Sequence, residues 1–228
     1  LAPYRSVNYL RFMLRRAFLL AVLVPAAALA HPHVFVDATV EAVFDDQGRL
    51  TAFRIGWTYD ELFSLMLVEE SGADPDGDGQ VSVDEMQALD GFDMDWGTDF
   101  LGDAYVVQGA AAVALAPGPQ DWKTGWADGR LWSTHTRTLE APLTPGPEGV
   151  TIQIYDPGYY VAYAITGEPE VTGRGDCTAT IFVPDLDAAQ TQLLDSLKEY
   201  APGDDLEDVV FPNVGADFAE EVRVTCGP

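Results

Sequence analysis

Stretches in which apolar and polar residues alternate recur along most of this chain, and they constrain its fold more than any other feature. Residues 34–44 read VFVDATVEAVF, where every second position is apolar, and residues 50–57 form another such stretch after the turn-like DDQG at 45–48. Because side chains alternate between the two faces of a β-strand, this two-residue period predicts strands. The short turn between them predicts that the two strands pair as a hairpin.

Further segments rich in β-branched and aromatic residues follow, and Pro/Gly-rich turns separate them. They are 105–115, 131–139, 150–155, 159–165 and 177–183, with a closing strand over 220–225. Apolar residues at helical spacing occur over 60–70, 83–89 and 187–200. We therefore expect an α+β fold of mostly antiparallel β-sheet, with a helix–loop–helix inserted at about 58–92 and a C-terminal helix.

The loop of this insertion reads DPDGDGQVSVDE from Asp74 to Glu85. An EF-hand loop takes oxygen ligands from positions 1, 3, 5, 7, 9 and 12 and needs glycine at position 6. The ligand positions hold Asp74, Asp76, Asp78, Gln80, Ser82 and Glu85, and Gly79 fills the sixth. We predict an EF-hand-type Ca²⁺ site that is occupied constitutively by the millimolar calcium found outside cells. The alternative is an acidic turn that binds no ion.

The first thirty residues have the composition of a signal peptide. Four arginines and no acidic residue precede the apolar run AFLLAVLVPAAALA at 17–30. This run is short for a membrane span and ends in small residues, as a signal peptide does. We expect cleavage before His31, leaving 31–228 as a single metal-binding domain in the periplasm or the medium. A retained anchor is the alternative. The rest of the chain has no second long apolar run, so we expect no membrane insertion after cleavage.

Charge and cysteine content agree with export. The chain has 12 basic and 37 acidic residues and a formal charge of −25, so it should repel nucleic acid and attract cations. Its two cysteines, Cys177 and Cys226, are expected to form one disulfide in an oxidising compartment, with two free thiols as the alternative.

Two of the three histidines would stand at the new N-terminus. The α-amino group and imidazole of His31 and the imidazole of His33 present nitrogen ligands suited to Zn²⁺, Ni²⁺ or Co²⁺. Pro32 between them removes the amide that a square-planar N-terminal copper or nickel site would use. The alternative is an exposed terminus without a metal.

Two other residues are candidates for the same transition-metal site. His135 lies in a predicted strand and would join it if that strand lay beside the first one; otherwise it is an ordinary strand histidine. Asp60 is a candidate fourth ligand, with a helix N-cap as its alternative role. Asp156, in a Pro/Gly turn, is more simply explained as a turn residue.

Several of these motifs together resemble a family of uncharacterised exported bacterial proteins. They are HPHVFV at 31–36, WTYD at 57–60, the acidic loop at 74–85, and YDP at 155–157 with Tyr159 and Tyr160. Members of that family are often described as the periplasmic component of an ABC-type transport system and are encoded beside nickel/cobalt-type permeases. The resemblance implies a role in zinc or nickel handling. The chain lacks the two similar lobes typical of a solute-binding protein.

These observations predict an exported, calcium-stabilised accessory protein that holds Zn²⁺ or Ni²⁺/Co²⁺ and assists a membrane metal permease. The alternative is a calcium-rigidified protein-binding module with no transition-metal role. We do not expect an enzyme, since the sequence has no Gly-x-Ser-x-Gly or His-Glu-x-x-His motif. Copper oxidation by an N-terminal histidine brace is the enzymatic alternative, and it is not favoured. The oligomeric state is not predicted.

Overall fold

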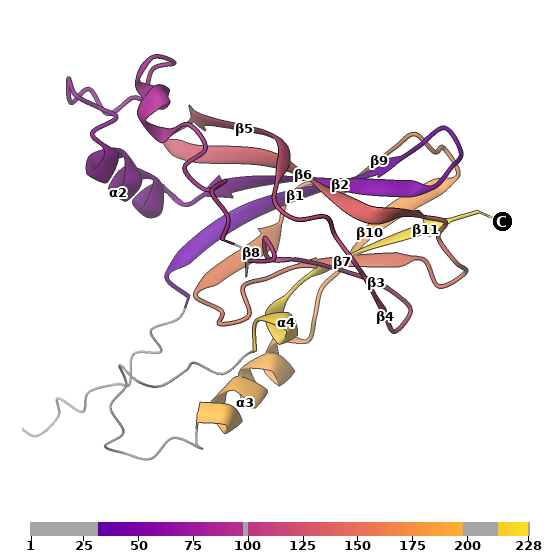
Figure 1. Cartoon of the computed structure of the whole chain (residues 1–228). Coiled ribbons are helices and arrows are strands. Elements are labelled where there is room, and N and C mark those ends of the chain that lie inside the picture. The colour runs from indigo at the N-terminus through magenta and orange to yellow at the C-terminus, as the bar shows by residue number, and fades with distance from the viewer. Residues whose placement is uncertain (1–31, 98–99, 198–213, 228) are drawn as a thin grey trace, which may run out of the picture. The chain divides into compact units, whose positions relative to one another are not determined.

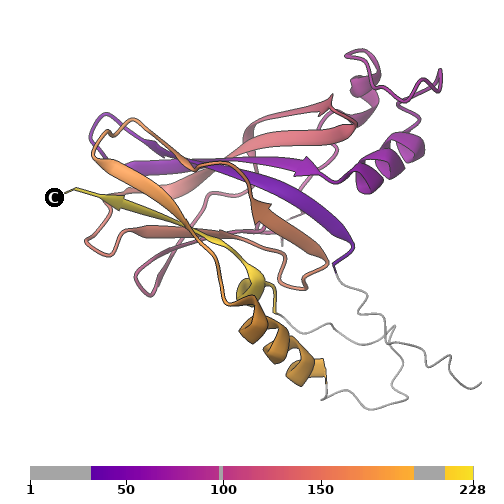
Figure 2. The ribbon, with the colours of Figure 1, turned by 180° about the vertical axis from the view of Figure 1, so that it is seen from behind.

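A computed structural model describes residues 32–97, 100–197 and 214–227, which all belong to one compact unit, His31–Pro228. The predicted signal peptide at 1–30 and the ligand candidate His31 lie outside the described residues. In Figures 1 and 2 this unit consists of two β-sheets that lie one above the other, with helices at their ends.

The first sheet is mixed. Its strand order is β5 (Gln120–Ala127), β6 (Arg130–Leu143), β2 (Leu50–Tyr59), β1 (Val34–Phe44) and β8 (Val161–Ile165), and β9 (Glu170–Thr172) also pairs with β1. The predicted hairpin is confirmed, because β1 and β2 are antiparallel neighbours. By contrast, β1 pairs in parallel with both β8 and β9.

The second sheet is antiparallel throughout. Its strand order is β10 (Cys177–Phe182), β11 (Glu221–Cys226), β7 (Val150–Ile154), β3 (Ala104–Gln108) and β4 (Ala111–Val113). The single strand predicted over 105–115 is therefore a tight hairpin. The chain turns at Gly109, whose φ of 59° suits glycine.

Side chains from both sheets form one hydrophobic core. Alternate residues of β1 are buried, from Val34 to Phe44, as the two-residue period predicted. Ile152 of β7 and Val224 of β11 contribute from the other sheet. The mostly antiparallel α+β fold is thus confirmed, while the parallel pairings of β1 were not foreseen.

The helices are few and short. They are α2 (Glu61–Ser71), the 3₁₀ helix η1 (Glu85–Leu89), α3 (Leu186–Leu197) and α4 (Gly215–Phe218). The second helix of the predicted insertion is therefore only a 3₁₀ segment, whereas the first is a regular α-helix. None of the helices in the described ranges is long and apolar enough to span a membrane.

The predicted disulfide joins Cys177 and Cys226. These residues face each other in the register of β10 and β11, so the bond fastens adjacent strands of the second sheet. A disulfide is consistent with an exported protein.

Candidate functional site

Carboxylates converge in the loop that follows α2. Oxygens of Asp74, Asp76 and Asp78 lie within 4.8 Å of one another. Asp74 Oδ1 accepts hydrogen bonds from the N–H groups of Gly77 (2.9 Å) and Asp78 (3.1 Å), and its Oδ2 accepts one from Gly79 (3.0 Å). The loop is therefore wrapped around the carboxylate of Asp74, and Gly79 takes the left-handed conformation (φ 75°) expected of it.

The electrostatics of this loop differ between its aspartates. The hydrogen bond from the Gly79 N–H is the main reason that the pKa of Asp74 is lowered. A hydrogen bond from the Asp78 N–H also favours ionisation of Asp76, but repulsion from Asp78 and the contacts with Asp74 outweigh it and raise the pKa of Asp76. The negative charges thus oppose one another, a condition that a bound cation would relieve.

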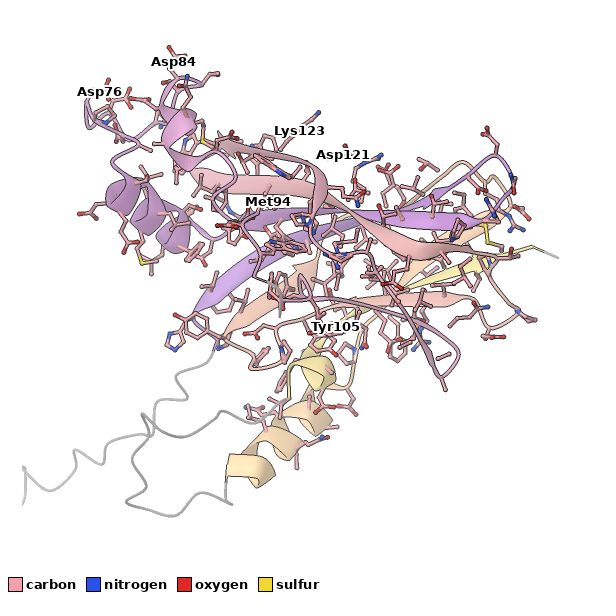
Figure 3. The ribbon with its side chains drawn as sticks, viewed as in Figure 1. Asp76, Asp84, Met94, Tyr105, Asp121 and Lys123 are labelled. Carbon is pink, nitrogen blue, oxygen red and sulfur yellow. A yellow bond between two sulfur atoms is a disulfide. The ribbon has the colours of Figure 1, made fainter. Side chains whose placement is uncertain are left out.

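The end of the loop is fixed by a reciprocal pair of hydrogen bonds. Ser82 N–H donates to Glu85 Oε2 (2.8 Å), and Glu85 N–H donates to Ser82 Oγ (3.4 Å), which is the arrangement of a capping box. Val81 is buried between the predicted ligands Gln80 and Ser82. Figure 3 shows Asp76 and Asp84 in the projecting segment beyond α2, away from the body of the two sheets.

Asp60 is a structural residue at the start of α2. Its Oδ1 accepts from the Phe63 N–H (2.9 Å), which is an N-cap bond, and its Oδ2 accepts from the Phe35 N–H (2.8 Å) of β1. Both carboxylate oxygens are therefore engaged with the backbone. This geometry favours the helix-cap role over that of a metal ligand.

His33 is exposed immediately before β1. Its N–H donates to the Tyr160 carbonyl (2.8 Å), and the two rings lie 4.7 Å apart. The backbone of the predicted N-terminal site is thus anchored to the segment before β8. The position of His31, its expected partner, lies outside the described residues.

The structure does not bring His135 to His33. His135 pairs with Ile55 of β2, which pairs with Val40 of β1, so β6 is not adjacent to β1. Val40 lies seven residues from His33, which corresponds to about 23 Å along a strand. The condition for a three-histidine site, adjacent strands, is therefore not met for His135.

His135 instead belongs to the core. It is 0% exposed, its ring contacts Trp57 (4.5 Å) and Trp96 (5.2 Å), and neither ring nitrogen has a hydrogen-bond partner. Burial, with a smaller contribution from Arg137, lowers the pKa of His135 to about 3, so the imidazole is neutral. Arg137 lies 4.8 Å from the Trp96 ring centroid and donates to the Gly118 carbonyl (3.1 Å).

A second group of polar residues lies near the core, and it was not predicted from the sequence. Tyr59 donates its hydroxyl proton to Asp93 Oδ2 (2.7 Å), and Ser133 donates to the same oxygen. Burial raises the pKa of Asp93, although both hydrogen bonds oppose that shift. Asp93 therefore carries a partly desolvated carboxylate.

A similar pair is formed by Tyr163 and Asp103. The Tyr163 hydroxyl donates to Asp103 Oδ2 (2.8 Å), and burial raises the pKa of Asp103 to about 7. Asp156, which adds to this shift by repulsion, is itself held in the predicted turn role by the N–H groups of Gly158 and Tyr160. Asp93 and Asp103 lie in a segment, 90–105, that mixes several aspartates with aromatic residues, so the sequence does not distinguish them from their acidic neighbours.

Helix α2 exposes several apolar side chains. Leu62 and Met66, which belong to the apolar residues at helical spacing over 60–70, are 79% and 44% exposed. Ser64 is fully buried instead, and its Oγ accepts from the Leu131 N–H (3.0 Å) of β6. The helix therefore packs on β6 through a small polar residue and presents leucines outward.

Comparison with known proteins supports one part of the resemblance noted from the motifs, namely that the chain belongs to an uncharacterised family. A model of a family described as proteins of unknown function, DUF1007, matches residues 16–226. An uncharacterized protein of Haemophilus influenzae is 22% identical over 214 residues, which cover 92% of this chain and 98% of that protein. Because the family model spans nearly the whole sequence, this chain belongs to the DUF1007 family.

Proposed function

We propose that this protein is an exported, calcium-stabilised accessory protein of divalent-metal transport. The observation that carries the proposal is the convergence of the Asp74, Asp76 and Asp78 carboxylates within 4.8 Å. Ca²⁺ prefers several oxygen ligands in a flexible arrangement, and the loop offers them at the spacing of an EF-hand. Glu85 and the carbonyl of Gln80 would complete the shell.

In this proposal calcium has a structural role. The loop joins α2 to η1, and the acidic side chains repel one another when no cation is present. Calcium would neutralise them and hold the two helices in one arrangement. A single exported loop of this kind is expected to bind with a Kd on the order of 10⁻⁴–10⁻³ M, which suits a constitutive site.

The transition metal would be held at the N-terminus. His33 is exposed, and its backbone N–H is held by the Tyr160 carbonyl just before β8; the amine and imidazole of His31 would supply further nitrogen ligands. Zn²⁺, Ni²⁺ or Co²⁺ bound there would be accessible for transfer to a membrane permease. His135 has no part in this site, since it is buried and distant.

The calcium role is tested by thermal unfolding of the protein beginning at His31. We expect 1–10 mM Ca²⁺ to raise Tm in the parent protein, because a ligand that binds only the folded state stabilises it. Glu85→Gln should lose most of this shift while keeping the acceptor for the Ser82 N–H. Asp84→Asn removes the same charge from a non-ligand position and should retain the shift. An unchanged Tm in the parent protein would exclude the calcium site.

The transition-metal role is tested by calorimetric titration of the same protein with Zn²⁺ and Ni²⁺. We expect binding that is lost on His33→Ala and on extension of the N-terminus by foreign residues. The calcium response of both variants should remain normal, which shows that they are folded. Equal zinc binding by the parent, His33→Ala and the extended protein would contradict the proposed N-terminal site.

A second candidate function is a calcium-rigidified protein-binding module without a transition metal. It is favoured by the exposed apolar side chains beside the loop, which are Leu62 (79%), Leu65 (51%), Met66 (44%) and Val83 (87%). Such a patch next to an ordered loop is typical of a protein-interaction surface. The partner would be another exported protein or the outward face of the permease.

A further inference from the structure

A cavity of about 570 Å³ opens where the two sheets meet α2. Its walls come from β1, β2 and β8 of the first sheet, from β3 of the second and from the segments before β3 and β8. Tyr105 of β3, which lines the cavity, lies below β1 and β8 in the view of Figure 3. Its volume lies within the range of pockets that bind small organic molecules, about 300–1,000 Å³.

The electrostatic character of the cavity is negative. Asp93, Asp103 and Asp156 line it, and none of its described lining residues is lysine, arginine or histidine. Asp93 and Asp103 are largely buried, and each is held by a tyrosine hydroxyl, Tyr59 and Tyr163 respectively. Low local polarity strengthens their attraction for a cation.

Aromatic rings form most of the remaining wall. The side chains of Trp57, Tyr59, Tyr105, Tyr160 and Tyr163 surround the space, together with phenylalanines at 63 and 100. The face of an aromatic ring attracts a cation, and the attraction is stronger when water is excluded. A cavity lined by aromatic faces and carboxylates therefore favours a cation that carries apolar substituents.

The geometry argues against a bare metal ion in this cavity. Among the described residues, only the loop aspartates bring three candidate ligand atoms within 4.8 Å of one another, so the cavity carboxylates do not converge. A hard divalent cation needs six or more oxygens at close range and is strongly hydrated. A bulky, weakly hydrated cation does not need convergent ligands.

We propose that this cavity binds a small organic cation, an ammonium compound carrying methyl or other apolar substituents. The ammonium group would lie between the Asp103 and Asp93 carboxylates and contact the rings of Trp57, Tyr105 and Tyr163. The proposal is independent of calcium binding and of the N-terminal histidines.

The test uses choline and its uncharged carbon analogue, 3,3-dimethyl-1-butanol, as probes. Binding to the full mature protein is measured at pH 8 and in 1 mM Ca²⁺ by calorimetry and by tryptophan fluorescence. We expect choline to bind at least tenfold more tightly than the analogue. Equal binding of the two, or binding of neither, would overturn the proposal, whatever the calcium and zinc results.

Variants locate the probe in the cavity. Asp103→Asn should weaken choline binding at least tenfold, while Asp46→Asn, the same change in the exposed β1–β2 turn, should leave it unaltered. Tyr105→Leu keeps an apolar side chain but removes a ring, and several-fold weaker binding is expected. Circular dichroism confirms folding of each variant. Unchanged choline affinity in both folded cavity variants would contradict the assignment.

Discussion

At the scale of single residues, the most unusual feature is the number of ionisable side chains close to the core. Asp103 is 6% exposed, and among the described residues the Tyr163 hydroxyl is the side-chain group that hydrogen-bonds its carboxylate. His135 is fully buried beside Arg137, so both basic groups lose hydration without gaining a carboxylate. Such residues reduce stability, and they are typically retained where a protein binds something.

Asp103 predicts a pH dependence of stability. Its pKa is about 7 in the folded protein against 3.8 as the ordinary value, so between these values the folded state binds more protons than the unfolded state. Stability from this group therefore falls as pH rises from about 4 to 7. The side chain of the Asp103→Asn variant cannot ionise. The unfolding free energy of this variant, relative to that of the parent, should therefore increase by on the order of 2–4 kcal/mol from pH 4.5 to pH 8.

The measurement is urea unfolding of both proteins at several pH values. Because other groups titrate in both proteins, only the difference between them reports on Asp103. A difference that stays constant with pH would show that Asp103 has an ordinary pKa.

Prediction from sequence was uneven at this scale. The EF-hand spacing located the aspartates that the structure brings together, because their ligand geometry is encoded in twelve consecutive residues. The cavity was not foreseen. Asp93, Asp103 and Tyr163 come from distant segments, and only the pairing of strands brings them together. His135 was predicted as a candidate ligand, but its burial depends on Trp57 of the neighbouring strand β2 and on Trp96 from the segment after η1.

At the scale of elements, the two-residue period was a reliable guide where one face of a strand is buried. The bounds of β1 were predicted as observed, and β6 begins within one residue of the prediction. Strand β5 was missed because it lies at the sheet edge and exposes most of its residues, so its sequence QDWKTGWA has no apolar alternation. Edge strands commonly lack that signal.

Helix α2 gives a prediction about the proposed interaction surface. A photo-crosslinking residue at position 62 should yield a discrete protein adduct in the native host, whereas the same residue at Thr178, exposed on β10, should not. Leu62→Gln should abolish binding of the protein partner. It should change the unfolding free energy by less than about 0.5 kcal/mol, since the side chain is 79% exposed. Val68→Ala, on the buried face, should cost at least about 1 kcal/mol.

Absence of a position-62 adduct in the presence of millimolar calcium would count against the protein-binding function. A large loss of stability in Leu62→Gln would show instead that this leucine is part of the fold.

At the scale of the whole molecule, the two sheets share one core and the second is fastened by the Cys177–Cys226 bond. The bond encloses α3 and α4 between β10 and β11, with a separation of 49 residues. The sequence predicted the bond from cysteine number alone. It did not predict which strands it joins, because sheet order is set by contacts between distant segments.

Replacing both cysteines by alanine should lower the unfolding free energy by about 2–4 kcal/mol, since the unfolded chain regains the freedom of a loop of this length. Equilibrium unfolding in urea, with the parent protein in reductant as a control, measures the change. Equal midpoints for the oxidised and cysteine-free proteins would show that the bond does not contribute to stability.

The parallel pairing of β1 has a consequence for biogenesis. When a chain emerges amino end first, β1 and β2 are present before β8. The edge of β1 that pairs with β8, beginning at Val34 and Val161, therefore stays unpaired until residue 161 has emerged. Until then the hairpin of β1 and β2 presents an unsatisfied backbone edge that invites pairing with other chains. Holdase chaperones should therefore increase the yield of the folded protein, and slowing translation between residues 60 and 160 should increase its aggregation.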